Sequence, residues 1–182
     1  MRYPHCVTVI CLALVLSLGA VGPDPQPTPS SATWPGSLRN GLPRELKGFA
    51  TAPKDEFPDT DENEMGVYTQ VSRRYQRIES RSVARSFVLL VQDYGAGKDL
   101  AGSLRNATRA TAKVEGFSGR EQQIGGRTAF VVFHRDGEKP VTVVTVLATP
   151  SRVVLGLGDN LEEAETVRLV SQVDFQKTAD AK

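Results

Sequence analysis

Alternating apolar and polar positions predict two adjacent strands in the first regular part of the chain. Residues 65–78, "MGVYTQVSRRYQRI", have the period of a half-buried strand. Their apolar face consists of Met65, Val67, Val71 and Tyr75. Residues 82–94, "SVARSFVLLVQDY", form a more apolar segment with Phe87, Leu89 and Val91 on one side. The short interval between the two segments requires an antiparallel pair, because a parallel neighbour needs a long crossover.

The spacing then changes to that of a helix. Apolar positions recur at steps of four, three and four at Leu100, Leu104, Ala107 and Thr111. Asp99 stands at the expected N-cap position. We therefore predict an amphipathic helix directly after this residue.

Turn signals divide the next fifty or so residues into four strands. Gly125-Gly126 suits a tight turn that needs positive φ, and Asp136-Gly137 lies between two β-branched runs. The "TPSR" segment, residues 149–152, turns the chain into "VVLGLG". Asn160 with Glu163 three residues later then indicates a capping box and a second amphipathic helix. That helix should bury Ala164, Val167 and Val170, and Glu162 and Glu165 add negative charge to its first turn.

The order of these elements predicts an α+β domain over residues 59–178, with a disordered tail at 179–182. We expect an antiparallel β-sheet of about six strands in the order ββαββββα, covered by two amphipathic helices. Consecutive strands joined by tight turns fix the antiparallel arrangement.

The segment before the domain differs in composition. Residues 1–22 hold one arginine and then a hydrophobic run that ends in small residues, which predicts a cleaved secretory signal. An uncleaved N-terminal anchor is the alternative, and lipidation is poorly supported because Ile10 precedes Cys11. Residues 23–58 hold eight of the 11 prolines and predict a largely disordered linker, although residues 42–58 have a composition compatible with a short ordered arm.

The charge and the cysteine content limit the classes of partner and cofactor that the chain is expected to bind. The chain has 22 basic and 21 acidic residues, a formal net charge of +1, so it has no general attraction for nucleic acid. Any membrane contact should come only through the N-terminal segment, if that segment is not cleaved. Both cysteines, Cys6 and Cys11, lie in that segment, which leaves the domain without a disulfide or a cysteine-bound metal. We expect no cofactor.

Three motifs resemble catalytic or ion-binding signatures but lack required parts. Gly97-Lys98 matches the end of a phosphate-binding loop, but Gln92 replaces its first glycine and Asp99 its hydroxyl residue. "HRDG", residues 134–137, lacks the asparagine of a kinase loop and holds the one histidine outside the leader. The acidic stretch 55–64 starts like a calcium loop without its glycine and final glutamate, which leaves only a weak cation site open.

A group of arginines is the strongest candidate binding surface. Arg73, Arg77, Arg81 and Arg85 have the same strand parity, so an uninterrupted ribbon would place them on one face beside Tyr75. A turn near Glu79-Ser80 would break that register. We consider both a partner- or anion-binding patch and two polar strand ends that the acidic loop partly neutralises.

The stretch "IGGRTAFVVFHRDGEKPVTVVTVLATPSRVVLGLGDN" and the ending "LVSQVDFQKTA" resemble exported bacterial envelope proteins of uncharacterised function. The strand–strand–helix–meander–helix order is similar to the α/β sandwich of the photosystem II extrinsic PsbP proteins. The resemblance covers roughly residues 65–178 and implies export and a binding or accessory role, with no functional residue carried over.

The leading hypothesis is an exported, non-catalytic binding or accessory module of the cell envelope, periplasmic or extracellular. It would recognise a protein or small ligand through a sheet face or the arginine-bearing strands. The alternatives are a hydrolase that uses His134 with Asp136 or another carboxylate, and a structural subunit of an envelope assembly.

Overall fold

The computed structural model describes residues 35–51, 58–63, 66–79, 82–95, 97–136 and 139–181. The strands are β1 (Ala50–Thr51), β2 (Pro58–Asn63), β3 (Gly66–Glu79), β4 (Ser82–Asp93), β5 (Phe117–Ile124), β6 (Arg127–Asp136), β7 (Lys139–Thr149) and β8 (Arg152–Asp159). The helices are α2 (Pro35–Arg39), α3 (Ala101–Thr111), α4 (Glu163–Val170) and α5 (Phe175–Asp180). None of the helices in the described part of the chain has both the length and the hydrophobicity of a membrane-spanning segment.

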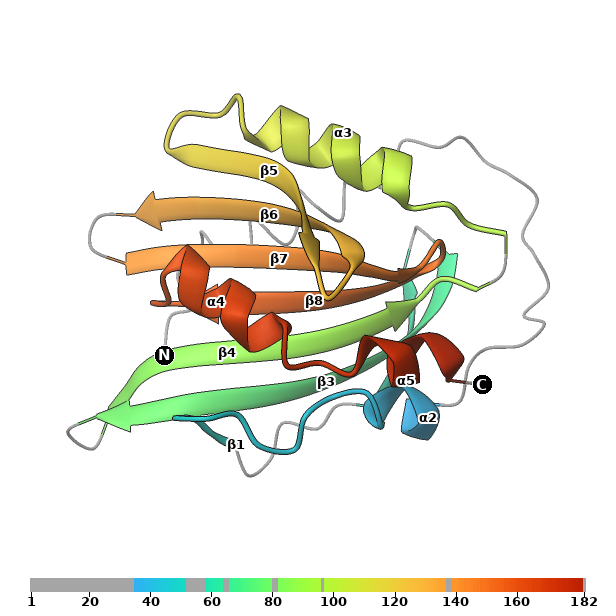
Figure 1. Cartoon of the computed structure of the whole chain (residues 1–182), viewed down its shortest axis with the longest axis horizontal. Coiled ribbons are helices and arrows are strands. Elements are labelled where there is room, and N and C mark those ends of the chain that lie inside the picture. The colour runs from blue at the N-terminus through green and yellow to red at the C-terminus, as the bar shows by residue number, and fades with distance from the viewer. Residues whose placement is uncertain are drawn as a thin grey trace.

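The strands form one antiparallel sheet in the order β1-β3-β4-β8-β7-β6-β5, and β2 pairs with β3 outside this path (Figure 1). The α+β class and the antiparallel sheet are confirmed. The predicted count and order are wrong: β1, β2 and α2 come in addition, and the terminal helix is two helices, α4 and α5. Helices and strands as short as these have too few residues to show a hydrophobic period in the sequence.

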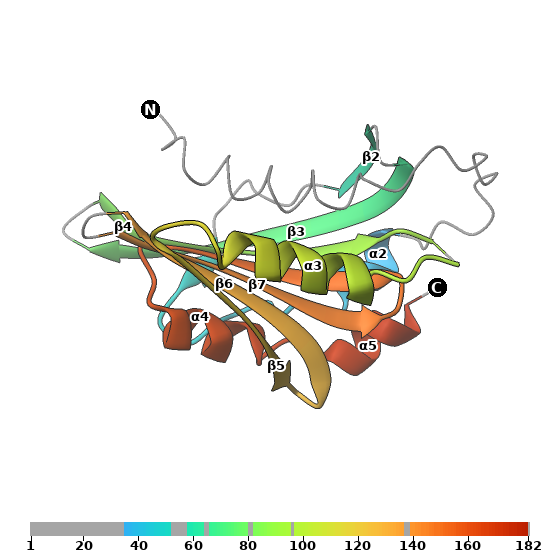
Figure 2. The same cartoon turned by 90° about the horizontal axis from the view of Figure 1, so that it is seen from above.

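Helices cover both faces of the sheet. Figure 2 shows α4 and α5 on one side and α3 on the other. The larger core lies on the α4 side and includes Val71, Tyr75, Phe87, Leu89 and Val91. The smaller core packs Leu104 of α3 and the preceding Leu100 against β6, β7 and β8. The residues just named were predicted to lie on the buried faces of β3, β4 and α3, and they are buried in the structure.

The helix ends differ in part from the prediction. Asp99 Oδ1 accepts the backbone N–H of Ala101 at 3.1 Å, so it caps α3 from one position before the assigned N-cap. Asn160 does not cap α4, because it has a φ of 56° and the helix begins only at Glu163. The buried residues of α4 are Thr166, Leu169 and Val170, whereas the predicted Ala164 is exposed.

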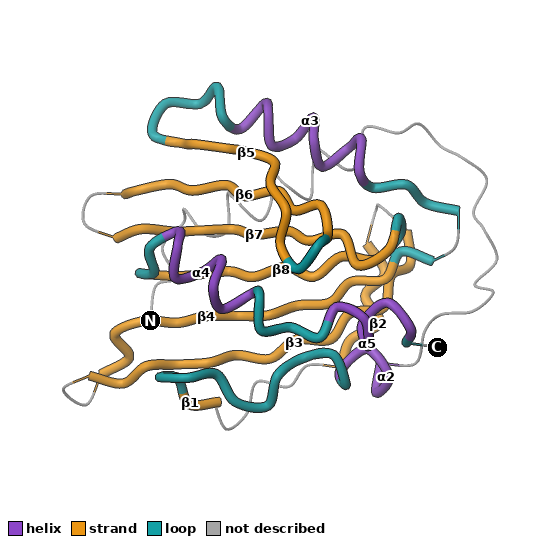
Figure 3. The backbone as a smooth tube through the Cα atoms, viewed as in Figure 1, coloured by secondary structure: helices purple, strands orange, loops and turns teal. Residues whose placement is uncertain are grey.

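Residues 35–51 form an N-terminal arm that packs on the sheet, as the tube in Figure 3 shows beside β3 and α5. Its buried side chains recur at short intervals and belong to the larger core: Leu38, Leu42, Leu46 and Phe49. The linker predicted for residues 23–58 therefore does not extend through this segment. The predicted tail is also shorter, because α5 includes Ala179 and Asp180. The leader and residues 23–34 and 52–57 lie outside the described residues.

Candidate binding site

β3 and β4 place three of the four predicted arginines on the same side of the sheet. Arg77 lies directly opposite Arg85 in the β3–β4 register, immediately before a register shift at Ile78. Side chains that face each other across an antiparallel pair point to one face. Arg73 shares that face with Arg77 because strand side chains alternate with a period of two. Arg81 lies outside the described residues, so its part in the patch stays a prediction.

Arg73 and Tyr75 hold the N-terminal arm against β3. The Arg73 guanidinium donates from Nη1 to the carbonyl oxygens of Leu42 and Pro43 at 3.0 and 2.8 Å. The Tyr75 hydroxyl also donates to the Pro43 carbonyl. Burial raises the pKa of Tyr75 to about 12, against the opposing effect of the nearby Arg73 charge. Tyr75 has no exposed surface, so it cannot touch a partner in this structure.

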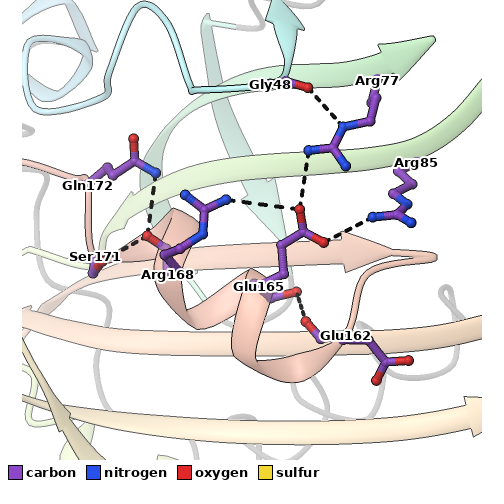
Figure 4. A network of polar contacts seen from close by, with 9 residues as sticks. Gly48, Arg77, Arg85, Glu162, Glu165, Arg168, Ser171 and Gln172 are labelled. Carbon is purple, nitrogen blue, oxygen red and sulfur yellow. Dashed lines mark hydrogen bonds and ion pairs between the residues drawn. The ribbon is translucent and has the colours of Figure 1, made fainter. Parts of the chain in front are cut away.

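Arg77 and Arg85 instead converge on a carboxylate of α4, together with Arg168 of the same helix (Figure 4). The Glu165 carboxylate lies 3.3 Å from Arg77 Nη2, 3.2 Å from Arg85 Nη1 and 4.0 Å from Arg168 Nη2. We call Arg77, Arg85 and Arg168 around Glu165 the arginine cluster. Neither Glu165 nor Arg168 was part of the patch predicted from the sequence.

The three arginines differ in how firmly they are held. Arg77 donates from Nε to the Gly48 carbonyl at 3.0 Å, and its guanidinium carbon lies 4.7 Å from the Phe49 ring centroid. Arg85 and Arg168 contact only Glu165 through their guanidinium groups among the described residues. Arg77 is thus fixed by the N-terminal arm, whereas Arg85 and Arg168 are available at the surface.

The charges of the cluster do not balance. Three guanidinium groups share one carboxylate, and among the residues that the structure describes no second carboxylate pairs with any of them. The arginine side chains are 29, 38 and 51% exposed in the order Arg77, Arg85 and Arg168. Within the described part of the chain, two positive charges therefore have no matching carboxylate on this half-exposed surface.

Several other arginines of the molecule each pair with a single carboxylate, unlike the three that surround Glu165. Glu162 and Glu163, which precede and begin α4, each pair with one arginine of the opposite end of the sheet, Arg135 and Arg120. Arg105 of α3 pairs with Glu121 of β5, where hydrogen bonding to the arginine lowers the pKa of the carboxyl group. Exposed pairs of this kind contribute little to stability. The three-to-one arrangement at Glu165 thus sets the cluster apart among these pairs.

His134, the basis of the hydrolase alternative, lies near the end of β6. Its ring stacks on Phe117 at 4.1 Å between centroids, and Nδ1 is 2.9 Å from the Gly116 carbonyl oxygen. The Asp136 side chain is not among the described side chains, so a pairing of His134 with Asp136 is not tested. The described residues contain no group of three or more His, Cys, Asp or Glu that could hold a metal ion. The hydrolase alternative stays a prediction.

The Gly95–Lys98 segment connects β4 to α3. Gly95 and Gly97 have φ values of 78° and 87°, which side chains with a Cβ rarely adopt, and the Gly95 N–H donates to Asp93. β4 pairs antiparallel with both of its neighbours, β3 and β8. A phosphate-binding loop follows a strand of a parallel sheet, so this segment is a corner, as the sequence predicts.

The predicted weak cation site falls on residues 55–64, of which 58–63 form β2. The carboxylate side chains of this segment lie outside the described side chains. A calcium site here therefore stays a prediction.

Comparisons with protein-family models, with curated proteins and with solved structures found no match. The similarity to PsbP proteins and to exported envelope proteins therefore stays a prediction.

Proposed function

We propose that the protein is an exported, non-catalytic binding module that recognises an acidic segment of an envelope protein through the arginine cluster. The observation that carries this proposal is the arrangement of three half-exposed guanidinium groups around one carboxylate. Export rests on the hydrophobic run and small residues of residues 1–22.

Physical chemistry favours a carboxylate-rich ligand. A guanidinium group offers donors in a planar fork that matches a carboxylate, and such charge-assisted hydrogen bonds are stronger than neutral ones. Arginine is also enriched in protein interfaces. The near-zero net charge of the chain means that attraction for an acidic segment must arise locally, at this cluster.

The test compares two double variants of the full chain with a fluorescein-labelled oligoglutamate peptide as the probe. The first, Arg85→Gln with Arg168→Gln, removes two charges from the cluster and leaves Arg77 on the N-terminal arm. The second, Arg105→Gln with Arg135→Gln, removes two arginines of similar exposure from one-to-one pairs elsewhere.

Fluorescence anisotropy at low ionic strength should show at least about a tenfold loss of affinity for the first variant, because charge-assisted contacts of this kind contribute more than 1.4 kcal/mol. The matched control should change the affinity by less than about threefold, since each of its arginines serves one acidic partner. Equal losses in the two variants, or no measurable binding by the wild type, would overturn the proposal.

A further inference from the structure

Glu165 of α4 lies at the position that a ligand carboxylate would take in the arginine cluster. Its oxygen Oε1 is 3.3 Å from Arg77 Nη2, and its oxygen Oε2 is 3.2 Å from Arg85 Nη1 (Figure 4). One carboxylate thus spans the pair of arginines that face each other across β3 and β4. An acidic segment bound at this position competes with Glu165 for the same donors.

The contacts of Glu165 are long for groups of opposite charge. Charge-assisted hydrogen bonds between a guanidinium and a carboxylate typically measure about 2.7–2.9 Å. Arg77 and Arg85 each donate a single hydrogen bond to Glu165, at 3.3 and 3.2 Å, and Arg168 at 4.0 Å is too distant to donate one. The Glu165 carboxylate therefore has weaker contacts than a well-placed ligand carboxylate would form.

A second arginine–glutamate pair of the same molecule shows the stronger geometry. Arg105 donates from Nε and from Nη2 to the two oxygens of Glu121, at 2.7 and 3.0 Å. Two parallel hydrogen bonds of this kind give both geometric specificity and energy. A ligand carboxylate that pairs with Arg85 in this way would gain more than Glu165 loses.

Displacement of Glu165 leaves the rest of the site in place. Arg77 keeps its hydrogen bond from Nε to the Gly48 carbonyl, which belongs to the N-terminal arm. The helix itself stays docked through its buried side chains, Thr166, Leu169 and Val170. The Glu165 side chain is already 22% exposed, so its carboxylate regains water when it rotates away from the strands.

We propose that Glu165 is an internal competitor that occupies the arginine cluster and is displaced by the acidic ligand. This inference rests on the proposed function, because it concerns the regulation of the same site. The apparent affinity of a ligand falls with the fraction of molecules in which its site is free. Occupation of the site by Glu165 in about four of five molecules corresponds to about a fivefold loss of affinity.

The test replaces the carboxylate by a neutral amide of the same shape, Glu165→Gln. Fluorescence anisotropy of the full chain with fluorescein-labelled oligoglutamate at low ionic strength should show at least about a fivefold gain in affinity over the wild type. An affinity equal to or lower than that of the wild type would overturn the proposal, because Glu165 would then position the guanidinium groups for the ligand.

Glu121→Gln is the matched control, because it removes one carboxylate from a pair with an arginine and changes the net charge equally. Glu121 lies on β5, five strands away from β3 in the sheet, which is about 24 Å. The control should change the affinity by less than about twofold, since the interaction between charges weakens with distance. Equal gains in Glu165→Gln and Glu121→Gln would contradict the proposal.

A second background locates the gain at the cluster. When Arg85→Gln and Arg168→Gln are present, Glu165→Gln should change the affinity by less than about twofold, because two of the groups for which ligand and carboxylate compete are gone. The comparison is a double-mutant cycle on ligand binding. Equal gains in the two backgrounds would show that Glu165 acts only through its general charge, against the proposal.

The two proposals fail separately. Wild-type binding that weakens in Arg85→Gln with Arg168→Gln, together with no gain in Glu165→Gln, would overturn the internal competitor and leave the proposed function standing. Binding by Glu165→Gln and not by the wild type would support the competitor and contradict binding of this ligand by the unmodified chain. No binding by either protein would overturn both proposals.

Discussion

Tyr75 and Tyr94 place phenol groups in buried surroundings on opposite faces of the sheet. Burial raises the pKa of each to about 12, and the neighbouring Tyr68 also raises that of Tyr94. Both hydroxyl groups donate hydrogen bonds in their neutral form, Tyr75 to the Pro43 carbonyl and Tyr94 to Gln92. The folded protein therefore holds these protons at a pH at which the unfolded chain has released them.

The sign of the pH dependence follows from this difference. Between pH 10 and 12 the native state binds more protons than the unfolded state, so the free energy of unfolding falls as the pH rises. The contribution is complete below pH 10 and is lost as the pH passes through about 12. Urea unfolding of the wild type at pH 9, 10, 11 and 11.5 should show this decrease in the free energy of unfolding.

The variant Tyr75→Phe with Tyr94→Phe provides the comparison. It should lose less stability over the same pH interval, although it starts from a lower value at neutral pH because two hydrogen bonds are removed. Parallel pH profiles of the two proteins would show that these phenols do not cause the alkaline loss.

Two glycines of β8 set the distance between the sheet and α4. A Cβ at Gly156 would overlap the Val170 side chain and approach Phe87 within 3.2 Å, and one at Gly158 would overlap Thr166. The helix can thus lie close to the strand only where β8 has no side chain on that face. The arrangement brings Glu165 within reach of Arg77 and Arg85 (Figure 4).

Gly156→Ala should therefore destabilise the protein by about 1–3 kcal/mol, because Val170 is buried and stiff and cannot yield without moving α4. Gly102→Ala is the control, since nothing lies within 4 Å of its Cβ position in α3. This change should stabilise the protein by about 0.5 kcal/mol, because alanine lowers the conformational entropy of the unfolded chain. Thermal unfolding of both variants measures the difference, and a neutral Gly156→Ala would contradict the proposed close contact.

The elements with a clear period were predictable from the sequence, and those fixed by tertiary contacts were not. The β5–β6 and β6–β7 hairpins follow from glycine-containing turn signals and the β7–β8 hairpin from the TPSR segment. Val71, Tyr75 and Phe87 face the predicted core. Asn160 has the composition of a helix cap, but the chain takes a left-handed turn there before α4 begins. The buried residues Leu38, Leu42, Leu46 and Phe49 of the N-terminal arm recur at steps of four, four and three, a helical spacing, but α2 covers only Pro35–Arg39, so the local period does not give the structure of the arm.

The candidate site was also predictable only in part. Strand parity placed Arg73, Arg77 and Arg85 on one face, which the structure confirms through the direct pairing of Arg77 with Arg85. The sequence could not show that Tyr75 is buried under the arm. It also could not show that α4 packs on β7 and β8 with Glu165 within reach of Arg77 and Arg85, which brings Glu165 and Arg168 into the cluster. The i, i+3 spacing of those two residues was the one local signal for their pairing.

At the scale of the whole molecule, one buried ion pair links the sheet to the C-terminal helix. Arg152 Nη2 lies 2.6 Å from Asp93 Oδ2, and both side chains are less than 10% exposed. The same guanidinium donates from Nη1 to the carbonyl oxygens of Thr178, Ala179 and Ala181. Arg152 thus joins β4, β8 and α5 at one point.

Arg152→Met should cost about 3–5 kcal/mol, because it takes away the cation that faces the buried Asp93 carboxylate. Adding Asp93→Asn should recover part of this loss, since a neutral amide is less costly to bury than a charge. Urea unfolding of the two single variants and the double variant gives the coupling energy. Additive effects would contradict a direct interaction.

The strand order also bears on synthesis at the ribosome. β4 receives its second neighbour only when β8 has been made, because Val91 pairs with Val154. At a translation rate of about 5–20 residues per second, the nascent chain waits on the order of several seconds between the two. During that interval one row of β4 amides and carbonyls has no native partner and offers a template for pairing with another chain.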